Sequence, residues 1–156
     1  MNDHSTEKAV LIVALCVAKD GTIFIPLTHS DRWRNIQWRI PGGGVERNEI
    51  PEQAAHRELL EETNIKAKEM HPVLVVDKPS RDNHNYTHHQ HVFVCEVESF
   101  EQMYERICDG KETLINKLFS LQDLQDYLWK GVPCSRFPIL LPHAKVLDYT
   151  LKKIFL

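Results

Sequence analysis

Three glutamates near the middle of the chain carry the strongest chemical signal in the sequence. Glu58, Glu61 and Glu62 fall at positions i, i+3 and i+4 of a predicted helix, so their carboxylates lie within one helical turn. Like charges at this spacing destabilise a helix by roughly 0.2–0.5 kcal/mol per pair unless a cation sits between them. For an isolated E-x-x-E-E pattern, a solvated acidic surface is the simpler interpretation.

The residues just before this helix favour a metal site over a plain acidic surface. Three consecutive glycines, residues 42–44, let a backbone carbonyl approach a ligand closely. Clustered carboxylates with a nearby carbonyl are the hard oxygen ligands that Mg²⁺ prefers, and waters and substrate phosphate fill its remaining positions. Arg57 can hold a neighbouring carboxylate in a fixed orientation through its planar guanidinium. The pattern therefore indicates a Mg²⁺ site that acts on a phosphate-containing substrate.

Gly43, Glu49 and residues 57–65 together resemble the Nudix box, G-x5-E-x7-R-E-U-x-E-E-x-G-U, in which U is a bulky aliphatic residue. Every fixed position matches except Asn64, which stands where the family has glycine. Asparagine tolerates the left-handed conformation better than most other residues, so we expect the turn to be kept. The box covers 23 of the 156 residues, and residues 38–43 are similar to the W-x-U-P-G-G lead-in of MutT-like members.

This resemblance implies an α/β/α sandwich with a mixed β-sheet, and a hydrolase that uses Mg²⁺, with Mn²⁺ as a substitute, to cleave phosphoric anhydrides. In the family, the metal neutralises the diphosphate and activates a water. Carried over, the catalytic residues are Arg57, Glu58 and Glu61, and the metal ligands are Glu58, Glu61, Glu62 and the carbonyl of Gly42. Gly43 and Glu49 would support this cluster. Arg57 would orient Glu58, which is the first candidate for the general base.

Four residues outside the box are further candidates for the site. Glu112, in a loop before a predicted strand, is the second candidate for the general base, and an exposed loop glutamate explains it equally well. Trp33 and Tyr86 lie in predicted polar loops, from which they could stack on a nucleobase. Arg39 could meet a phosphate, whereas Trp38 alternates with apolar neighbours and is expected in the core.

The sequence predicts cleavage of the diphosphate bond of a nucleoside diphosphate linked to another moiety. Oxidised nucleoside triphosphates, ADP-ribose, nucleotide sugars and dinucleoside polyphosphates all fit this description. The main alternative is a catalytically inactive Nudix-fold module that binds nucleotides. The histidine-rich segment from His84 to His91 allows three interpretations: a transition-metal site, a polar rim of the substrate cleft, or an exposed strand entry.

Hydrophobic periodicity and turn residues predict the elements that must position these side chains. We expect strands over 8–18 and 22–27 joined by a turn, a short strand over 36–40 that Pro41 and the glycines end, and a helix over 51–63. Further strands are expected over 73–76, 91–97 and 114–119, with a polar loop over 77–87, a helix over 121–127 and an amphipathic helix around 144–154. Strands and helices without regular alternation favour an α/β fold with a mixed sheet.

Length, charge and cysteine usage limit the class of protein. The 156 residues fit one domain over 1–156, and a net charge of −3 without a basic block argues against a partner of duplex nucleic acid. The apolar run 9–18 is too short to span a bilayer and lacks the positive lead-in of a signal peptide, so no membrane association is expected. No cysteine belongs to a C-x-x-C pair, which favours the reducing cytoplasm. The sequence carries no signal of oligomeric state.

Overall fold

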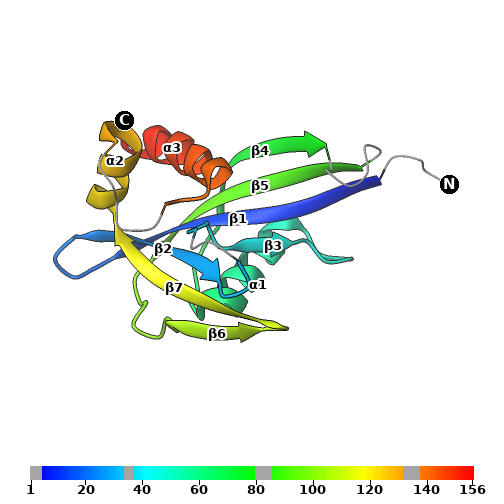
Figure 1. The fold of residues 1–156 in the computed structure, drawn as a ribbon, viewed down its shortest axis with the longest axis horizontal. Coiled ribbons are helices and arrows are strands. Elements are labelled where there is room, and N and C mark those ends of the chain that lie inside the picture. Colours follow the sequence, from blue (N-terminus) through cyan, green and yellow to red (C-terminus); the bar gives the residue numbers. More distant parts are fainter. Residues whose placement is uncertain (1–4, 34–36, 80–85, 132–137) are drawn as a thin grey trace.

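The computed structural model describes residues 5–33, 37–79, 86–131 and 138–156 (Figure 1). In chain order its elements are β1 (Ser5–Val17), β2 (Ile23–Ser30), β3 (Gly42–Gly44), α1 (Pro51–Thr63), β4 (His71–Pro79), β5 (Tyr86–Val97), β6 (Arg106–Asp109), β7 (Glu112–Ser120), α2 (Leu121–Lys130) and α3 (Leu141–Phe155). Within these residues the strands form one seven-stranded sheet in the order β4-β5-β1-β2-β7-β6, and β3 also pairs with β1.

The long first strand, β1, organises the sheet. It pairs in parallel with β5 over nearly its whole length, and antiparallel with both β2 and β3. The remaining pairings, β2 with β7, β4 with β5 and β6 with β7, are antiparallel. The sheet is therefore mixed, as predicted.

Alternating side chains of β1 build two hydrophobic cores, one on each face of the sheet. Leu11, Val13 and Leu15 pack in a core that includes Leu124 of α2 and Leu147 of α3. The residues between them, Val10, Ile12, Ala14 and Cys16, pack in a second core with Ala54, Ala55 and Leu59 of α1. Figure 1 shows α2 and α3 on one side of the sheet and α1 on the other. The predicted α/β/α sandwich is confirmed.

Two predictions near the margins of the sheet were wrong because partly exposed strand segments tolerate polar side chains. The polar loop expected over 77–87 is shorter, since β4 continues to Pro79 and β5 begins at Tyr86, with Asp77 opposite His89 in the ladder. Strand β6, Arg106–Asp109, was not predicted at all. It is the other edge of the sheet and is mostly exposed, so it lacks the apolar alternation that marks a half-buried strand.

The glycine-rich segment also differs from its prediction. Residue 36 lies outside the described residues, and Trp38 and Arg39 make only isolated bridges, to Ile139 and Thr28. The glycines, expected to end a strand, form β3 beside β1. Glycine is needed there because a Cβ on Gly42 would lie 2.0 Å from the carbonyl oxygen of Val10. Trp38 is 3% exposed, which confirms that it belongs to the core.

The predicted helix boundaries on either side of the sheet are largely confirmed. Pro51 occupies the first turn of α1, and the cap residue Asn64 is left-handed, with φ 63° and ψ 26°. The hydroxyl oxygen of Ser120 accepts the N–H of Asp123 at 3.1 Å and so opens α2. That helix runs beyond the predicted residue 127 to Lys130, where Gly131 ends it with φ 69°.

The apolar segments and the thiols agree with the limits set by the sequence. Among the described residues, no helix has both the length and the apolarity needed to cross a bilayer. Cys16 and Cys95 are buried free thiols, and burial raises the pKa of each to about 12. Cys108 is an exposed free thiol, while Cys134 lies outside the described residues.

Candidate active site

Helix α1 presents two of its glutamates on the face that it buries. Ala55 and Leu59, one turn apart, fix this face against the core, and Glu58 and Glu62 lie along the same side with exposures of only 9% and 4%. The side chain of Glu61 is 52% exposed and lies at the rim. The three carboxylates predicted to act together therefore have two environments, two buried and one open to solvent.

Strand β3 turns its free backbone groups toward this helix. The bonds from Ile12 N–H to the Pro41 carbonyl and from Val45 N–H to the Lys8 carbonyl fix which residues of the strand bond to β1. In an antiparallel pair, every second residue directs its N–H and C=O groups away from the partner strand. In β3 these residues are Gly42 and Gly44, whose N–H and C=O groups face away from β1. The N–H of Gly42 accordingly donates to Oε1 of Glu62 at 2.8 Å.

The middle glycine of β3 makes room for the other buried carboxylate. A Cβ on Gly43 would lie 2.5 Å from both Cδ and Oε1 of Glu58, a separation that real Cβ atoms do not adopt. A Cβ on Gly44 would meet nothing within 4 Å. The absence of a side chain at Gly43 is therefore what lets the Glu58 carboxyl lie against the strand.

Arg57 ties the glycine strand, the loop and the helix together. Its Nε and Nη2 donate to the two carboxylate oxygens of Glu49 at 2.8 and 2.9 Å, a bidentate pair. Its Nη1 donates to Glu58 at 2.9 Å and to Glu61 at 3.2 Å, and Nη2 also donates to the carbonyl of Gly44 at 2.8 Å. The hydrogen bonds from Arg57 lower the pKa of Glu49 to about 2. The guanidinium thus lies among three carboxylates and offsets the repulsion between them.

Burial leaves the two inner carboxyl groups with raised pKa values. Desolvation raises the pKa of Glu62 to about 7, against the opposing effects of the Gly42 N–H and of Arg39. Desolvation also raises the pKa of Glu58, although Arg57 opposes it. The negative charge of Asp109, at the end of β6, contributes to both shifts. Ionising this face is therefore unfavourable unless a further positive charge is supplied.

The donor groups at this face fit a hard divalent cation. Glu58 and Glu62 offer buried carboxylate oxygens, Glu61 offers an exposed one, and the Gly42 carbonyl faces the same side of β3. Among the described residues no three acidic, histidine or cysteine side chains are already gathered at metal-binding distances, so binding would draw the carboxylates together. Since desolvation raises the pKa values of Glu58 and Glu62, a cation bound between them would lower the cost of ionising both groups.

Comparison with known proteins shows the family of the chain. The family model of the NUDIX domain matches residues 6–136. The chain belongs to the Nudix family. The membership predicted from the box is confirmed, and the matched region includes both the acidic helix and the strands that position it.

Curated relatives match part of their own length. Mouse diphosphoinositol polyphosphate phosphohydrolase 3-alpha is 31% identical over 110 residues, 70% of this chain and 62% of that protein. RNA pyrophosphohydrolase of Bartonella tribocorum is 43% identical over 47 residues, 30% of this chain and 27% of that protein. The Nudix chain therefore spans less than two thirds of the length of these relatives.

Solved structures match over almost the whole chain. The NUDIX domain of Shewanella oneidensis NrtR, solved with ADP ribose, has a TM-score of 0.70 and 15% identity, covering 99% of this chain and 90% of that one. The MutT protein of Methanosarcina mazei Go1 has a TM-score of 0.64 and 15% identity, covering all of both chains. At these identities the likeness shows the Nudix fold alone.

The two acidic residues of the β6–β7 hairpin have different surroundings. Glu112, the predicted second candidate for the general base, begins β7 and accepts a hydrogen bond from the hydroxyl of Ser30. Asp109, which the sequence did not single out, acts electrostatically on both Glu58 and Glu62. Its only sequence signal is the Asp-Gly pair of the turn, where Gly110 has φ 65°.

Of the three predicted substrate-binding residues, the structure brings two into contact. The ring of Trp33 lies against the Arg39 guanidinium, with 4.3 Å between the guanidinium carbon and the ring centroid. Arg39 in turn lines a hollow of about 150 Å³ beside Gly42 and Gly43. Tyr86 is the first residue of β5 rather than part of a loop, and its side chain lies outside the described residues. The structure thus brings Arg39 and Trp33 together at the glycine strand.

The histidine-rich segment does not form a metal cluster in the residues that the structure describes. His89 pairs with Asp77, its neighbour across the β4–β5 ladder, and His88 pairs with Glu7 at 3.3 Å. Burial lowers the pKa of His91. His84 lies outside the described residues. The observed contacts join imidazole and carboxylate groups on adjacent strands.

Residues of α3 line two hollows. The hollow beside the glycines is also lined by Gln90 and by His143, whose Nδ1 accepts the N–H of Ile40 at 3.0 Å. A second hollow of about 350 Å³, mostly apolar, lies between β4 and α3, and its lining residues are Leu74, Val76, Leu141, Pro142, Lys145, Val146 and Tyr149. Val76 of this second hollow, which we call the groove beside α3, lies opposite Gln90 of the first in the β4–β5 ladder.

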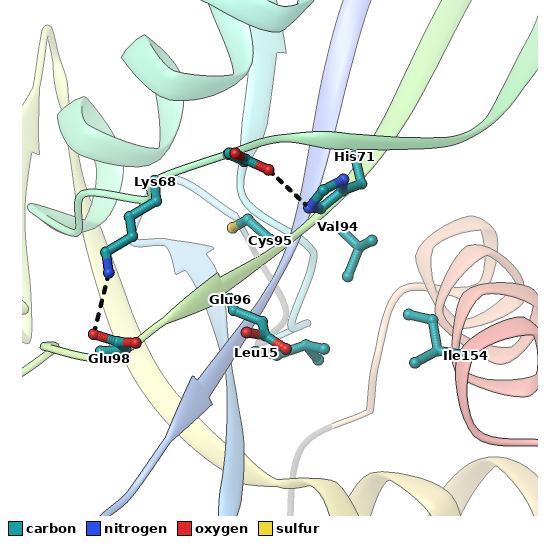
Figure 2. Close-up of a pocket in the computed structure, with 9 residues that line it drawn as sticks. Leu15, Lys68, His71, Val94, Cys95, Glu96, Glu98 and Ile154 are labelled. Carbon is teal, nitrogen blue, oxygen red and sulfur yellow. Dashed lines mark hydrogen bonds and ion pairs between the residues drawn. The ribbon is translucent and has the colours of Figure 1, made fainter.

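A third pocket, of about 330 Å³, lies away from the acidic helix face (Figure 2). Leu15, Val94 and Ile154 form its apolar part. Two polar contacts lie at this pocket. Nζ of Lys68 lies 3.4 Å from a carboxylate oxygen of Glu98, and Nε2 of His71 lies 3.7 Å from a carboxylate oxygen of Glu69. None of the box residues lines it, so the candidate active site is the glycine strand with α1 and the groove beside α3.

Proposed function

We propose that this protein is a Mg²⁺-dependent hydrolase that cleaves the diphosphate bond of a nucleotide-like substrate. One observation carries the proposal: Glu58 and Glu62 are buried side by side against the glycines of β3, with raised pKa values and with Arg57 holding the first of them. Such an arrangement disfavours an empty, fully ionised site and favours a bound cation. A purely structural acidic surface would have no reason to bury these groups.

The proposed roles follow from the contacts of each residue. Glu58, Glu61, Glu62 and the Gly42 carbonyl would hold Mg²⁺, for which Mn²⁺ can substitute, and the ion supplies charge neutralisation at the diphosphate oxygens. Arg57 and Glu49 orient this set from the side. Arg57 engages Oε1 of Glu58, which leaves Oε2 to take a proton from the attacking water.

Glu58 remains the first candidate for the general base. Burial raises its pKa, which brings the carboxylate closer to the basicity that proton transfer near neutral pH requires. We propose Asp109 as the second candidate in place of Glu112. The negative charge of Asp109 raises the pKa values of Glu58 and Glu62, whereas Glu112 accepts a hydrogen bond from the Ser30 hydroxyl.

The groove beside α3 supports a nucleoside as the rest of the substrate. Its lining is predominantly apolar, with Val76 and Tyr149 on opposite walls and Lys145 as a cation at the edge. A nucleobase can bury its faces on such a surface, whereas a polyphosphorylated inositol has no comparable apolar face. Of the substrates named for the relatives, nucleotides therefore fit better than diphosphoinositol polyphosphates.

Buried free thiols at Cys16 and Cys95 support a reducing, cytoplasmic location.

The test is a substrate screen with matched glutamine variants. Purified protein is incubated with ADP-ribose, nucleoside triphosphates, nucleotide sugars, dinucleoside polyphosphates and a diphosphoinositol polyphosphate, with and without Mg²⁺, and products are separated by chromatography. We expect Mg²⁺-dependent hydrolysis of a nucleotide substrate that Glu58→Gln or Glu61→Gln largely removes. Glu52→Gln, an exposed position in the first turn of the same helix, is the control. Binding of nucleotide without cleavage under every condition would instead support the inactive binding module.

A further inference from the structure

Arg39 is placed to meet the substrate, but its own backbone does not fix its guanidinium. The backbone of Arg39 exchanges two hydrogen bonds with Thr28, both at 2.9 Å, which sets the position of its Cα. Its side chain lines the hollow beside Gly42 and Gly43 and lies close enough to Glu62 to act on it electrostatically. A long arginine side chain at that rim loses rotamer freedom when it binds an anion, unless a neighbour already holds it.

Trp33 is that neighbour. The guanidinium carbon of Arg39 lies 4.3 Å from the centroid of the Trp33 ring, a distance at which tryptophan, the strongest partner among the aromatic residues, attracts a cation. One face of the ring meets the guanidinium, so that face is not available as a platform for a nucleobase. Stacking uses the flat face of the guanidinium and leaves its N–H edge to donate to an anion.

The segment that carries Trp33 is itself tied to the β6–β7 hairpin. The N–H of Asp31 donates to the Thr113 carbonyl at 3.0 Å, and the N–H of Thr113 donates to the Asp31 carboxylate at 2.9 Å. The Ser30 hydroxyl donates to Glu112, and the N–H of Trp33 donates to the Ser30 carbonyl at 3.2 Å. These contacts tie the turn to the hairpin, and they give Glu112 a structural role.

We propose that Trp33 is a positioning residue that holds the Arg39 guanidinium at the mouth of the acidic site, where Arg39 binds the phosphate oxygens of the substrate. The inference rests on the proposed function, since it takes the diphosphate as the ligand. Its consequence is that Trp33 acts only through Arg39. Removing the ring should weaken substrate binding without changing the chemical step.

A double-mutant cycle tests this with two readouts, hydrolysis kinetics and calorimetric binding of the uncleavable α,β-methylene-ADP with Mg²⁺. Trp33→Leu should raise both KM and Kd about two- to fivefold at constant kcat, and Trp33→Phe should restore part of the loss. Arg39→Met should raise KM and Kd about ten- to a hundredfold. Adding Trp33→Leu to Arg39→Met should raise neither of them further. Trp129→Phe, in α2, is the matched control, because Trp129 lines neither of the hollows at the candidate site.

Three outcomes would overturn the inference: an unchanged Kd in Trp33→Leu, losses that multiply in the double variant, or a fall in kcat alone. An active wild-type enzyme with any of these results would leave the proposed function standing. A protein that neither cleaves any diphosphate nor binds α,β-methylene-ADP would overturn both. A protein that binds the analogue without cleaving its natural counterparts would refute only the hydrolase, and the cycle in Kd would still decide the role of Trp33.

Discussion

Glu62→Gln should stabilise the metal-free protein, and only at neutral or alkaline pH. The raised pKa of Glu62 means that the folded state holds its proton more tightly than the unfolded chain does. The resulting stability is complete below pH 4.5, declines as the pH rises, and is lost above about pH 7. Glutamine cannot ionise and keeps an oxygen that can accept the Gly42 N–H.

The size of this effect follows from the two pKa values. Raising a pKa from 4.5 to about 7 corresponds to about 3 kcal/mol, and because Glu62 is only 4% exposed, solvent screening reduces it little. The variant and the wild type should thus be equally stable near pH 4.5. At pH 8 in EDTA the variant should be more stable by about 3 kcal/mol, or roughly 6–12 °C in Tm for a chain of this size.

Urea denaturation from pH 5 to pH 8 in EDTA measures the predicted divergence. Glu52→Gln, on the exposed start of the same helix, should follow the wild-type curve throughout. Millimolar Mg²⁺ should then stabilise the wild type at pH 8 more than at pH 5, and Glu62→Gln less than the wild type at either pH. Parallel stability curves for wild type and Glu62→Gln would refute the argument, because they would mean that Glu62 ionises in the fold without cost.

Three further outcomes follow from contacts in the site. Gly43→Ala should displace the Glu58 carboxyl and lower Mg²⁺-dependent activity by about a hundredfold, whereas Gly44→Ala, whose Cβ meets nothing, should be near wild type; equal activities would contradict the packing argument. Asn64→Val should cost on the order of 1–2 kcal/mol in urea denaturation because of its left-handed backbone, and Asn64→Gly less, since it loses only the side-chain bond to the Gln102 carbonyl; equal losses would argue against that conformation. In Arg57→Met, NMR titration should find the pKa of Glu49 raised from about 2 toward its ordinary range, and an unmoved value would show that Arg57 does not control it.

Most of the fold could be predicted because the central strands and α1 follow simple periodic rules. A continuous apolar and β-branched run marked β1, and Pro51 and Asn64 marked the ends of α1. The edge strand β6 escaped because an exposed strand needs no apolar alternation. The strand formed by residues 42–44 was not predicted because glycines normally weaken a strand. The contacts that require glycine there, with the Val10 carbonyl at Gly42 and the Glu58 carboxyl at Gly43, come from other elements.

The part of the site that lies within one turn of α1 could be predicted from the sequence. The spacing of Glu58 to Glu62 and the adjacent Arg57 follow from helix geometry, and the structure keeps them together. Asp109 and His143 come from other elements, and no local pattern relates residues so far apart in the chain to Glu62 or to the glycine strand. Whether Trp33 faces a base or an arginine likewise depends on tertiary contacts alone.

The pairing of β3 with β1 has a consequence for protein engineering. The pairing of β3 with β1 holds the Gly42 and Gly43 backbones beside α1, and β1 is itself anchored in parallel to β5, with Val10 opposite both Gly43 and His91. A peptide of residues 43–65, or the same segment grafted onto a foreign helix, would carry the carboxylates without the strand that crowds them. It should therefore bind Mg²⁺ only as weakly as any exposed acidic helix does, so the motif is not a portable module.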